Sequence, residues 1–209
     1  GIKYIQVPTT LLAAVDSSVG GKTAVDISAG KNLIGAFHQP ALVFCDISTL
    51  NTLPANIMRD GFAEVIKYGI ILDKELYNNL LKKESSLLEQ IISRCIEIKR
   101  DVVAADEFDK GERQLLNFGH TIGHSIELLS NFTITHGEAV AKGMVIAAKL
   151  GKECGYADVV EPIKNIVEMY GFNTYCPYSA TEIYKVALSD KKRDKNNITV
   201  VLPESIGKC

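Results

Sequence analysis

From Pro54 onward, apolar residues recur at helical spacing for most of the chain, and this pattern constrains the fold more than any other feature. It predicts helices over residues 55–71, 73–82, 85–105, 112–130, 137–154 and 159–170. Typical helix boundary signals are Asp73 as an N-cap, Thr135 with Glu138 as a capping box, Pro162 in a first turn, and Gly155 and Gly171 as stops. The sequence therefore predicts a mainly α fold.

The front of the chain has a different pattern. Residues 2–7 and 41–45 read as short buried strands, and residues 198–202 as one more. The polar, glycine-bearing stretch 16–35 is long for a loop, so we expect it to be functional. Because two strands alone do not make a stable sheet, we expect residues 1–54 to be the tail of an α/β domain and residues 55–209 an α-helical domain. The strand that opens directly at Gly1 leads us to expect a piece of a longer protein.

Composition excludes several classes of protein. With 46% hydrophobic and 23% charged residues, the chain is neither disordered nor of low complexity. Its net charge of -2 gives no field that would attract nucleic acid or anionic lipid, and no apolar run reaches the roughly 18 residues that span a bilayer. The 5 cysteines are scattered without a C-x-x-C pair. We therefore expect a cytoplasmic protein that binds neither nucleic acid nor membrane.

The predicted helix 112–130 carries a polar stripe. Arg113, Asn117, His120 and His124 are separated by 4, 3 and 4 residues, which places them on one helix face. A solvated face is the common fate of such a stripe, and a pocket wall is the alternative. Glycines at 119 and 123 favour the pocket wall, because they suggest that something approaches the backbone closely.

Two further residues are candidates to complete a metal site with His120. His136 opens the next predicted helix, which a short connection makes antiparallel to the first. Glu64 lies on an otherwise apolar helix face, where a carboxylate needs a partner. Glu64, His120 and His136 would leave one position of a zinc ion open for water or substrate. A plain ion pair between Glu64 and Lys67, at i+3, is the alternative.

The stretch 16–35 also offers groups that suit an anion. Gly20 and Gly21 precede Lys22, and Gly30 precedes Lys31 and Asn32, so backbone N–H groups and ammonium groups could meet a phosphate or a carboxylate. A turn with solvated lysines is the alternative. Asp16 stands where a P-loop requires glycine, and no G-x-G-x-x-G occurs in the sequence.

Several motifs occur in the order of a known family. The sequence resembles 3-dehydroquinate synthase from its first residue to Gly207, through the segments Val7-Pro-Thr-Thr-Leu-Leu-Ala13, Val15-Asp-Ser-Ser-Val-Gly-Gly-Lys-Thr23, Gly30-Lys-Asn-Leu-Ile-Gly-Ala-Phe37, Ala63-Glu-Val-Ile-Lys-Tyr-Gly69, Leu116-Asn-Phe-Gly-His-Thr-Ile-Gly-His124 and His136-Gly-Glu-Ala-Val-Ala-Lys-Gly-Met144. The resemblance implies an α-helical metal and substrate domain preceded by the remnant of a Rossmann-like NAD-binding domain. It also implies a homodimer.

The same resemblance implies an activity and a set of site residues. The activity is conversion of 3-deoxy-D-arabino-heptulosonate 7-phosphate to 3-dehydroquinate and phosphate, with transient oxidation by NAD and a Zn²⁺ or Co²⁺ ion. The implied metal ligands are Glu64, His120 and His136. The implied substrate and catalytic groups are Lys22, Asn32, Lys67, Lys99, Arg113, Asn117 and His124, with Asp16 and a lysine of the segment 190–192. The implied NAD contacts are Thr9, Thr10, Asp16, Lys31, Thr52 and Leu53.

Other functions remain as alternatives at this point. Another sugar-phosphate cyclase, such as 2-deoxy-scyllo-inosose synthase, shares the cofactors but takes a different sugar phosphate, and Lys22, Lys99, Arg113 and Asn117 favour the carboxylate-bearing substrate. A polyol dehydrogenase of the glycerol dehydrogenase type would turn over NAD in a net reaction. A helical domain that binds a metal or a partner without catalysis is the third. The family's glycine-rich turn under the NAD pyrophosphate has no counterpart in this sequence, so the activity of these 209 residues alone is a separate question.

Overall fold

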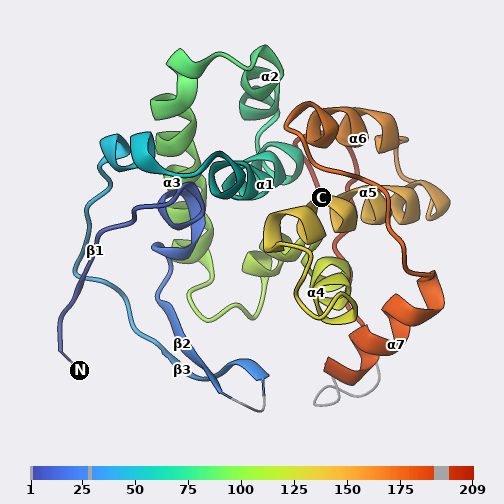
Figure 1. Ribbon diagram of the computed structural model, residues 1–209, viewed down its shortest axis with the longest axis horizontal. Helices are drawn as coiled ribbons and strands as arrows, with labels where there is room; N and C mark the ends of the chain where they lie inside the picture. The colour runs from blue at the N-terminus through green and yellow to red at the C-terminus, as the bar shows by residue number, and fades with distance from the viewer. Residues whose placement is uncertain (1, 28–29, 191–197) are drawn as a thin grey trace.

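The structure, a computed structural model, describes residues 2–27, 30–190 and 198–209, and most of its ordered elements are helices (Figure 1). The α-helices are α1 (Ala55–Ile71), α2 (Lys74–Lys82), α3 (Leu88–Ala105), α4 (His120–Leu129), α5 (His136–Glu153), α6 (Val160–Met169) and α7 (Ala180–Asp190). The strands are β1 (Ile5–Gln6), β2 (Lys22–Ile27), β3 (Gly30–Phe37) and β4 (Leu42–Val43). Four short segments are the π-helix η1 (Ala13–Ser17) and the 3₁₀-helices η2 (Ile47–Thr52), η3 (Ser85–Leu87) and η4 (Glu112–Asn117). The predicted mainly α fold is confirmed.

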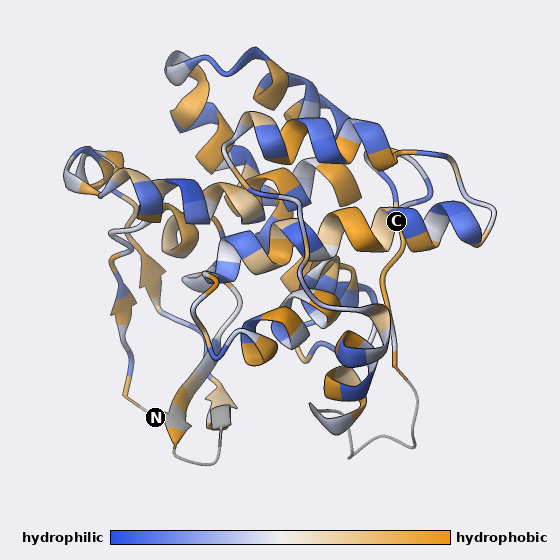
Figure 2. Cartoon of the chain, turned by 45° about the vertical axis from the view of Figure 1, so that its right-hand side comes forward, coloured by the Kyte–Doolittle hydropathy of each residue, from blue (hydrophilic) through white to orange (hydrophobic). Residues whose placement is uncertain are grey.

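The helices pack around α1, which lies in the middle of the bundle (Figure 1). α5 packs along both α1 and α4, while α2 and α6 also contact α1. Ile66, Phe118, Ile126 and Met144 are fully buried between these helices. Hydrophilic and hydrophobic residues alternate along most helices in Figure 2, as expected where each helix turns one face to a common core. In the described part of the chain, no helix has both the length and the hydrophobicity to cross a membrane.

Most predicted helix boundaries agree with the structure. The Asp73 carboxylate accepts a hydrogen bond from the Leu76 N–H (2.9 Å) at the start of α2, and the Thr135 hydroxyl accepts one from the Glu138 N–H (3.4 Å) at the start of α5. Gly155 and Gly171, which follow α5 and α6, have φ of +90° and +84°. These left-handed conformations suit glycine and end the two helices as predicted.

The predicted single helix 112–130 is wrong. η4 ends at Asn117, Gly119 adopts φ +76°, and α4 begins at His120. A Cβ on Gly119 would lie 2.7 Å from Met144 Cγ, and one on Gly123 would lie 3.1 Å from the Ala139 backbone. The element that approaches these glycines is therefore α5, and the two residues serve helix packing where we expected close approach to a site.

The stretch 16–35 is not the loop that we expected. β2 and β3 form an antiparallel hairpin in which Lys22 pairs with Phe37 and Val25 with Ile34, with a bulge between Val25 and Ile27. The sequence of neither strand alternates between polar and apolar residues, so the period of two that predicts a strand is missing. The predicted strands at 2–7 and 41–45 exist but are shorter, because only β1 and β4 pair, in parallel, over two residues each.

The carboxyl-terminal part differs from the prediction in two ways. Residues 198–202 form no strand: they run along the helices, where the Thr199 carbonyl accepts a hydrogen bond from the Thr121 hydroxyl (3.1 Å). Helix α7 was also not predicted. Its signal was present, since Ser179 and Glu182 form a capping box in which Ser179 N–H donates to the Glu182 carboxylate (2.8 Å) and Glu182 N–H to the Ser179 hydroxyl (3.3 Å).

Candidate metal and substrate site

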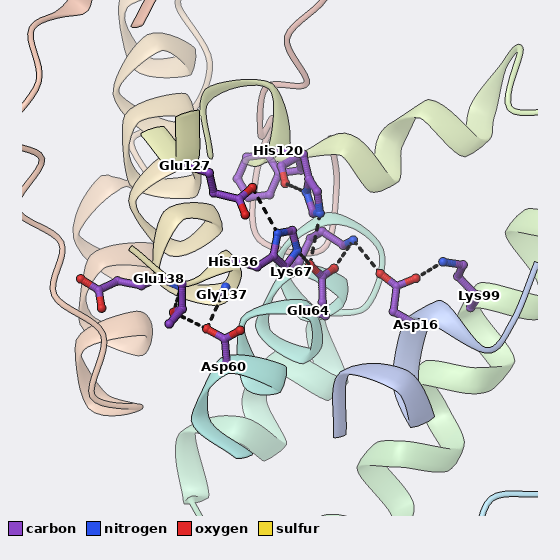
Figure 3. A network of polar contacts seen from close by, with 12 residues as sticks. Asp16, Asp60, Glu64, Lys67, Lys99, His120, Glu127, His136, Gly137 and Glu138 are labelled. Carbon is purple, nitrogen blue, oxygen red and sulfur yellow. Dashed lines mark hydrogen bonds and ion pairs between the residues drawn. The ribbon is translucent and has the colours of Figure 1, made fainter. Parts of the chain in front are cut away.

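Three helices bring Glu64, His120 and His136 together (Figure 3). Glu64 comes from the middle of α1, and the two histidines are the first residues of α4 and α5. The Nε2 atoms of His120 and His136 each lie 3.2 Å from the same oxygen, Glu64 Oε1. One potential ligand atom from each side chain falls within 4.8 Å of the others. The break at Gly119 matters here, because it makes His120 the first residue of a helix that packs on α5.

The second nitrogen of each imidazole faces an acceptor. His120 Nδ1 lies 3.1 Å from the Phe118 carbonyl oxygen, and His136 Nδ1 lies 3.5 Å from Glu127 Oε2. Both nitrogens of each imidazole therefore face acceptor oxygens, and a neutral ring has only one hydrogen to donate. With that hydrogen on Nδ1, the Nε2 lone pair faces Glu64. Three lone-pair donors that face one another require a positive charge between them, either a proton or a metal ion.

The electrostatics of the cluster agree with a positive charge beside Glu64. Burial alone would raise the pKa of Glu64, but the Lys67 ammonium and the two histidines outweigh it and hold the pKa well below its ordinary value. Burial alone would lower the pKa of His136, but Glu127 and Glu64 outweigh it and raise the pKa to about 9. Without a metal ion, His136 thus takes up the proton that the cluster needs.

The ion pair between Glu64 and Lys67 also forms, so the two interpretations of Glu64 hold together. Lys67 Nζ contacts Glu64 Oε2 and lies 3.6 Å from Asp16 Oδ2, while Oε1 of Glu64 faces the histidines. Asp16 also accepts a hydrogen bond from Lys99. Burial and the Arg113 charge lower the pKa of Lys99 to about 7, and the Asp109 carboxylate works in the opposite direction. A buried chain of alternating charges therefore runs from the histidines to Lys99 (Figure 3).

A cleft of about 610 Å³ lies beside this row of charged side chains. It lies between the β2–β3 hairpin on one side and residues of η1, α1, α3 and α4 on the other. Most of the residues predicted for substrate or metal binding line it, namely Asp16, Lys22, Lys67, Lys99, Arg113, Asn117, His120, His124 and His136. The cleft wall thus carries more cationic than anionic groups, although the predicted helical stripe that would have aligned four of them does not exist.

Two of the cationic residues have protein partners in this structure. The Arg113 guanidinium is buried and donates to the carbonyl oxygens of Glu107 (2.6 Å) and Gly20 (2.9 Å). Lys22 Nζ lies 2.5 Å from Asp109 Oδ2. These contacts join the hairpin to the loop between α3 and η4, so a ligand that engages Lys22 would displace Asp109.

Among the predicted NAD contacts whose side chains the structure describes, only Asp16 lines the cleft. Thr9 and Thr10 precede η1, where the Thr10 hydroxyl accepts a hydrogen bond from the Ala13 N–H (3.2 Å). Thr52 ends η2, its hydroxyl donating to the Thr49 carbonyl (3.3 Å), and Leu53 follows it. Lys31 and Asn32 belong to β3, but their side chains lie outside the described part, as do Lys191 and Lys192.

Sequence reasoning missed two acidic residues beside the metal candidates. Asp60 Oδ1 accepts hydrogen bonds from the Gly137 N–H (2.9 Å) and the Thr135 hydroxyl (2.5 Å), at the start of α5. Glu127 faces His136 from α4. A signal for Glu127 existed, because it follows His120 by seven residues, which is two helical turns.

Comparisons with known proteins identify the family of this chain. The family model described as 3-dehydroquinate synthase C-terminal matches residues 61–193, and the model described as 3-dehydroquinate synthase N-terminal matches residues 1–60. The chain belongs to the 3-dehydroquinate synthase family. Glu64, His120 and His136 all lie in the part that matches the C-terminal family, whereas Asp16 and Lys22 lie in the part that matches the N-terminal one.

Individual 3-dehydroquinate synthases are similar over the whole chain. The protein of that name from Thermodesulfovibrio yellowstonii is 48% identical over 220 residues, covering 100% of this chain and 61% of its own length. The one from Clostridium perfringens (strain SM101 / Type A) is 46% identical over 216 residues, covering 99% and 62%. The chain therefore spans about three fifths of the length of these relatives.

Solved structures of related synthases have the same fold. A 2-epi-5-epi-valiolone synthase from Streptomyces hygroscopicus subsp. jinggangensis 5008, with NAD⁺ and Zn²⁺ bound, superposes with a TM-score of 0.86 at 27% identity, covering 99% of this chain and 61% of that one. A 2-deoxy-scyllo-inosose synthase complexed with carbaglucose-6-phosphate, NAD⁺ and Co²⁺ gives 0.86 at 32% identity, covering 100% and 60%.

Proposed function

We propose that this chain forms the metal and substrate site of a 3-dehydroquinate synthase, which converts 3-deoxy-D-arabino-heptulosonate 7-phosphate to 3-dehydroquinate and phosphate. The observation that carries the proposal is the cluster of Glu64, His120 and His136 at a cleft with a cationic wall. A substrate that carries both a phosphate and a carboxylate suits such a wall, because ammonium and guanidinium groups bind these anions by charge-assisted hydrogen bonds.

The donor set fits zinc. Two ligand atoms that each lie about 2.0–2.1 Å from a tetrahedral ion stand about 3.3–3.4 Å apart. Both Nε2 atoms lie 3.2 Å from Glu64 Oε1, which is close to that separation. Three protein ligands leave the fourth position open, as in catalytic zinc sites, and Co²⁺ accepts the same nitrogen and oxygen donors. When bound, the ion would polarise substrate hydroxyl groups and NAD would take and return a hydride.

The remaining residues bind and orient the substrate. Lys22, Lys99, Arg113 and Asn117 would hold the phosphate and the carboxylate, with Asn32 as a further candidate on β3. Lys67 keeps Glu64 ionised through its contact with Oε2. His124 lies one turn after His120 at the cleft, with the ring centroids 5.4 Å apart, and is placed to move a proton at the substrate. Orientation matters because intramolecular steps depend on a bound conformation that permits them.

NAD contacts are part of the same proposal. Thr9, Thr10, Asp16, Lys31, Thr52 and Leu53 are the candidate residues. NAD⁺ in the two related synthases supports the cofactor. We also propose a domain division at about residue 54, a cytoplasmic location and a homodimer for the whole enzyme.

The related synthases define the second candidate function. The 2-deoxy-scyllo-inosose synthase with its bound carbaglucose-6-phosphate is 32% identical, against 44–48% for several 3-dehydroquinate synthases. The difference in identity favours the carboxylate-bearing substrate over a hexose phosphate.

The test compares phosphate release from two substrates. The chain is supplied with Zn²⁺ and NAD⁺, alone and as part of a full-length chain built with the amino-terminal region of the Thermodesulfovibrio yellowstonii relative. We expect phosphate release from 3-deoxy-D-arabino-heptulosonate 7-phosphate without net NADH, and none from a hexose 6-phosphate. His120→Ala should abolish the release. Preference for the hexose phosphate, or accumulation of NADH, would contradict the proposal.

A further inference from the structure

Glu127 lies behind His136, on the side away from Glu64. Its carboxylate is buried, with 6% of the residue exposed, and Oε2 lies 3.5 Å from His136 Nδ1 (Figure 3). We propose that Glu127 is a positioning residue that holds the His136 ring with Nδ1–H directed at its carboxylate and Nε2 directed at the metal position. This inference rests on the metal centre proposed above and names a residue outside the ligand set.

Burial of the Glu127 carboxylate has to be compensated by other groups. Removing an ionised carboxylate from water is costly unless hydrogen bonds or charges compensate for it. His136 is such a compensating group, because its Nδ1–H can donate to Oε2. The same contact favours the hydrogen on Nδ1 over a tautomer with the hydrogen on Nε2, which would point that hydrogen at Glu64 and the metal position. Glu127 thereby selects the form of His136 that can bind a metal ion through Nε2.

His120 shows the same arrangement with a different acceptor. Its Nδ1 faces the Phe118 carbonyl oxygen at 3.1 Å, and its Nε2 faces Glu64 Oε1. Both histidines therefore offer Nε2 to one point, and each is held from behind. A carboxylate acceptor makes an imidazole a stronger donor than a neutral carbonyl does.

Hydrogen bonds hold the main chain near both Glu127 and His136, and this positions their side chains relative to each other. The carbonyl oxygen of Glu127 accepts hydrogen bonds from the Ser130 hydroxyl (2.8 Å) and the Phe132 N–H (2.8 Å) at the end of α4. Asp60 caps the first turn of α5 through Gly137 N–H. Asp60 lies one turn before Glu64 on α1, so one helix supplies a metal ligand and also holds the start of the helix that carries His136.

A competing arrangement makes Glu127 a ligand. His124, Glu127 and His136 also place donor atoms within 4.8 Å of one another. A metal ion there would bind His136 through Nδ1, whereas the proposed centre uses Nε2. Glu64 is fully buried and His124 is exposed, and only the proposed centre satisfies the Glu64 oxygen that faces both histidines. The two arrangements thus predict opposite tautomers for His136.

The first experiment measures zinc affinity by competition with a chromophoric chelator at fixed pH. Glu127→Gln keeps an acceptor but removes the charge, and Glu127→Ala removes both. We expect zinc affinity to fall about 10-fold in the first variant and up to about 100-fold in the second. Glu138→Gln is the matched control, because Glu138 lies two residues from His136 but pairs with Lys142 (3.1 Å), and its affinity should equal that of the wild type.

The outcomes separate this inference from the metal centre itself. A wild-type chain that binds no zinc would contradict the metal centre and the role of Glu127 together. Normal zinc affinity in folded Glu127→Ala, with circular dichroism like that of the wild type, would contradict the role of Glu127 alone. A role confined to folding would lower the melting temperature and leave the zinc affinity of the folded protein unchanged.

The second experiment uses the wild-type chain, so it does not depend on a variant that folds. ¹⁵N spectra of the histidine rings, recorded with and without Zn²⁺, report which nitrogen carries the hydrogen. We expect zinc-bound His136 to keep its hydrogen on Nδ1 and to bind through Nε2. A His136 that binds zinc through Nδ1 would contradict the inference and support the competing arrangement with Glu127 as a ligand.

Discussion

From α1 onward the helices bury apolar side chains against one another, whereas most apolar side chains that the structure describes on the strands before α1 are exposed. Ile66 on α1 is fully buried, but Ile5 on β1 is 60% exposed and Leu42, opposite it on β4, is 52% exposed. A helix satisfies its backbone hydrogen bonds within itself and needs only a neighbour for one face. A pair of two-residue strands has no such independence. The helical part therefore supplies both the stable core and the candidate metal ligands.

The largest expected difference in stability is between isoleucine-to-alanine substitutions in the helices and in the strands. Ile66→Ala should lower the free energy of unfolding by about 2–5 kcal/mol, because it removes buried methyl groups and leaves a cavity. Ile5→Ala should change it by less than about 0.5 kcal/mol, because the side chain is already mostly in solvent. Urea denaturation followed by circular dichroism measures both. An equal loss of unfolding free energy in the two variants would contradict this difference, because the strands would then contribute to the cooperative core.

A smaller effect is expected at the boundary between the regions. Arg113 donates from the helical side to the carbonyl oxygens of Gly20 and Glu107, and a lysine cannot reach both in the same way. Arg113→Lys should lower the free energy of local opening of the β2–β3 hairpin by about 1.5–3 kcal/mol. Hydrogen exchange should become faster in β2 and β3 while α1 and α5 keep their protection. Faster exchange throughout the helices would show that Arg113 supports the core itself.

The smallest effect tests a helix end within the stable region. Asp73→Ala removes the N-cap of α2 and should lower the free energy of unfolding by about 1 kcal/mol. Asp73→Asn keeps a cap and loses only the ion pair with Arg94, so it should lower that free energy by about 0.5 kcal/mol. Burial works to raise the pKa of Asp73, but hydrogen bonds from Leu76 and Arg94 outweigh it and lower the pKa. The advantage of the wild type over Asp73→Asn should therefore exist above about pH 3.9 and disappear as pH falls through the folded pKa. Unfolding curves at several pH values check it, and an advantage that persists in acid would contradict the ionic account.

Sequence periodicity predicted the helices whose packing is simple. α1, α2, α5 and α6 have clear apolar faces and cap residues, and their boundaries lie within one or two residues of the prediction. The hairpin was missed because its sequence has no hydrophobic alternation, and none of the side chains that the structure describes on β2 and β3 is buried. The break at Gly119 was missed because it depends on Met144 and Val140 of α5, a tertiary contact that local sequence does not contain.

For the site, spacing and chemistry nominated Glu64, His120 and His136 before the structure brought them together. The reasoning about the stripe of Arg113, Asn117, His120 and His124 used a helix that does not exist, yet the cleft gathers all four. Asp109 and Glu127 could not be assigned a contact, because Lys22 and His136, which they face, lie on other elements. Long-range pairing of this kind follows from packing, and periodicity does not encode it.

The central claim is that the helical part builds a metal centre from Glu64, His120 and His136. Diffraction from a crystal of the chain grown with Zn²⁺, recorded on both sides of the zinc absorption edge, tests it most directly. The account predicts an anomalous peak about 2.0–2.2 Å from Glu64 Oε1, His120 Nε2 and His136 Nε2. A peak between His124, Glu127 and His136 Nδ1, or no peak at these histidines, would contradict it.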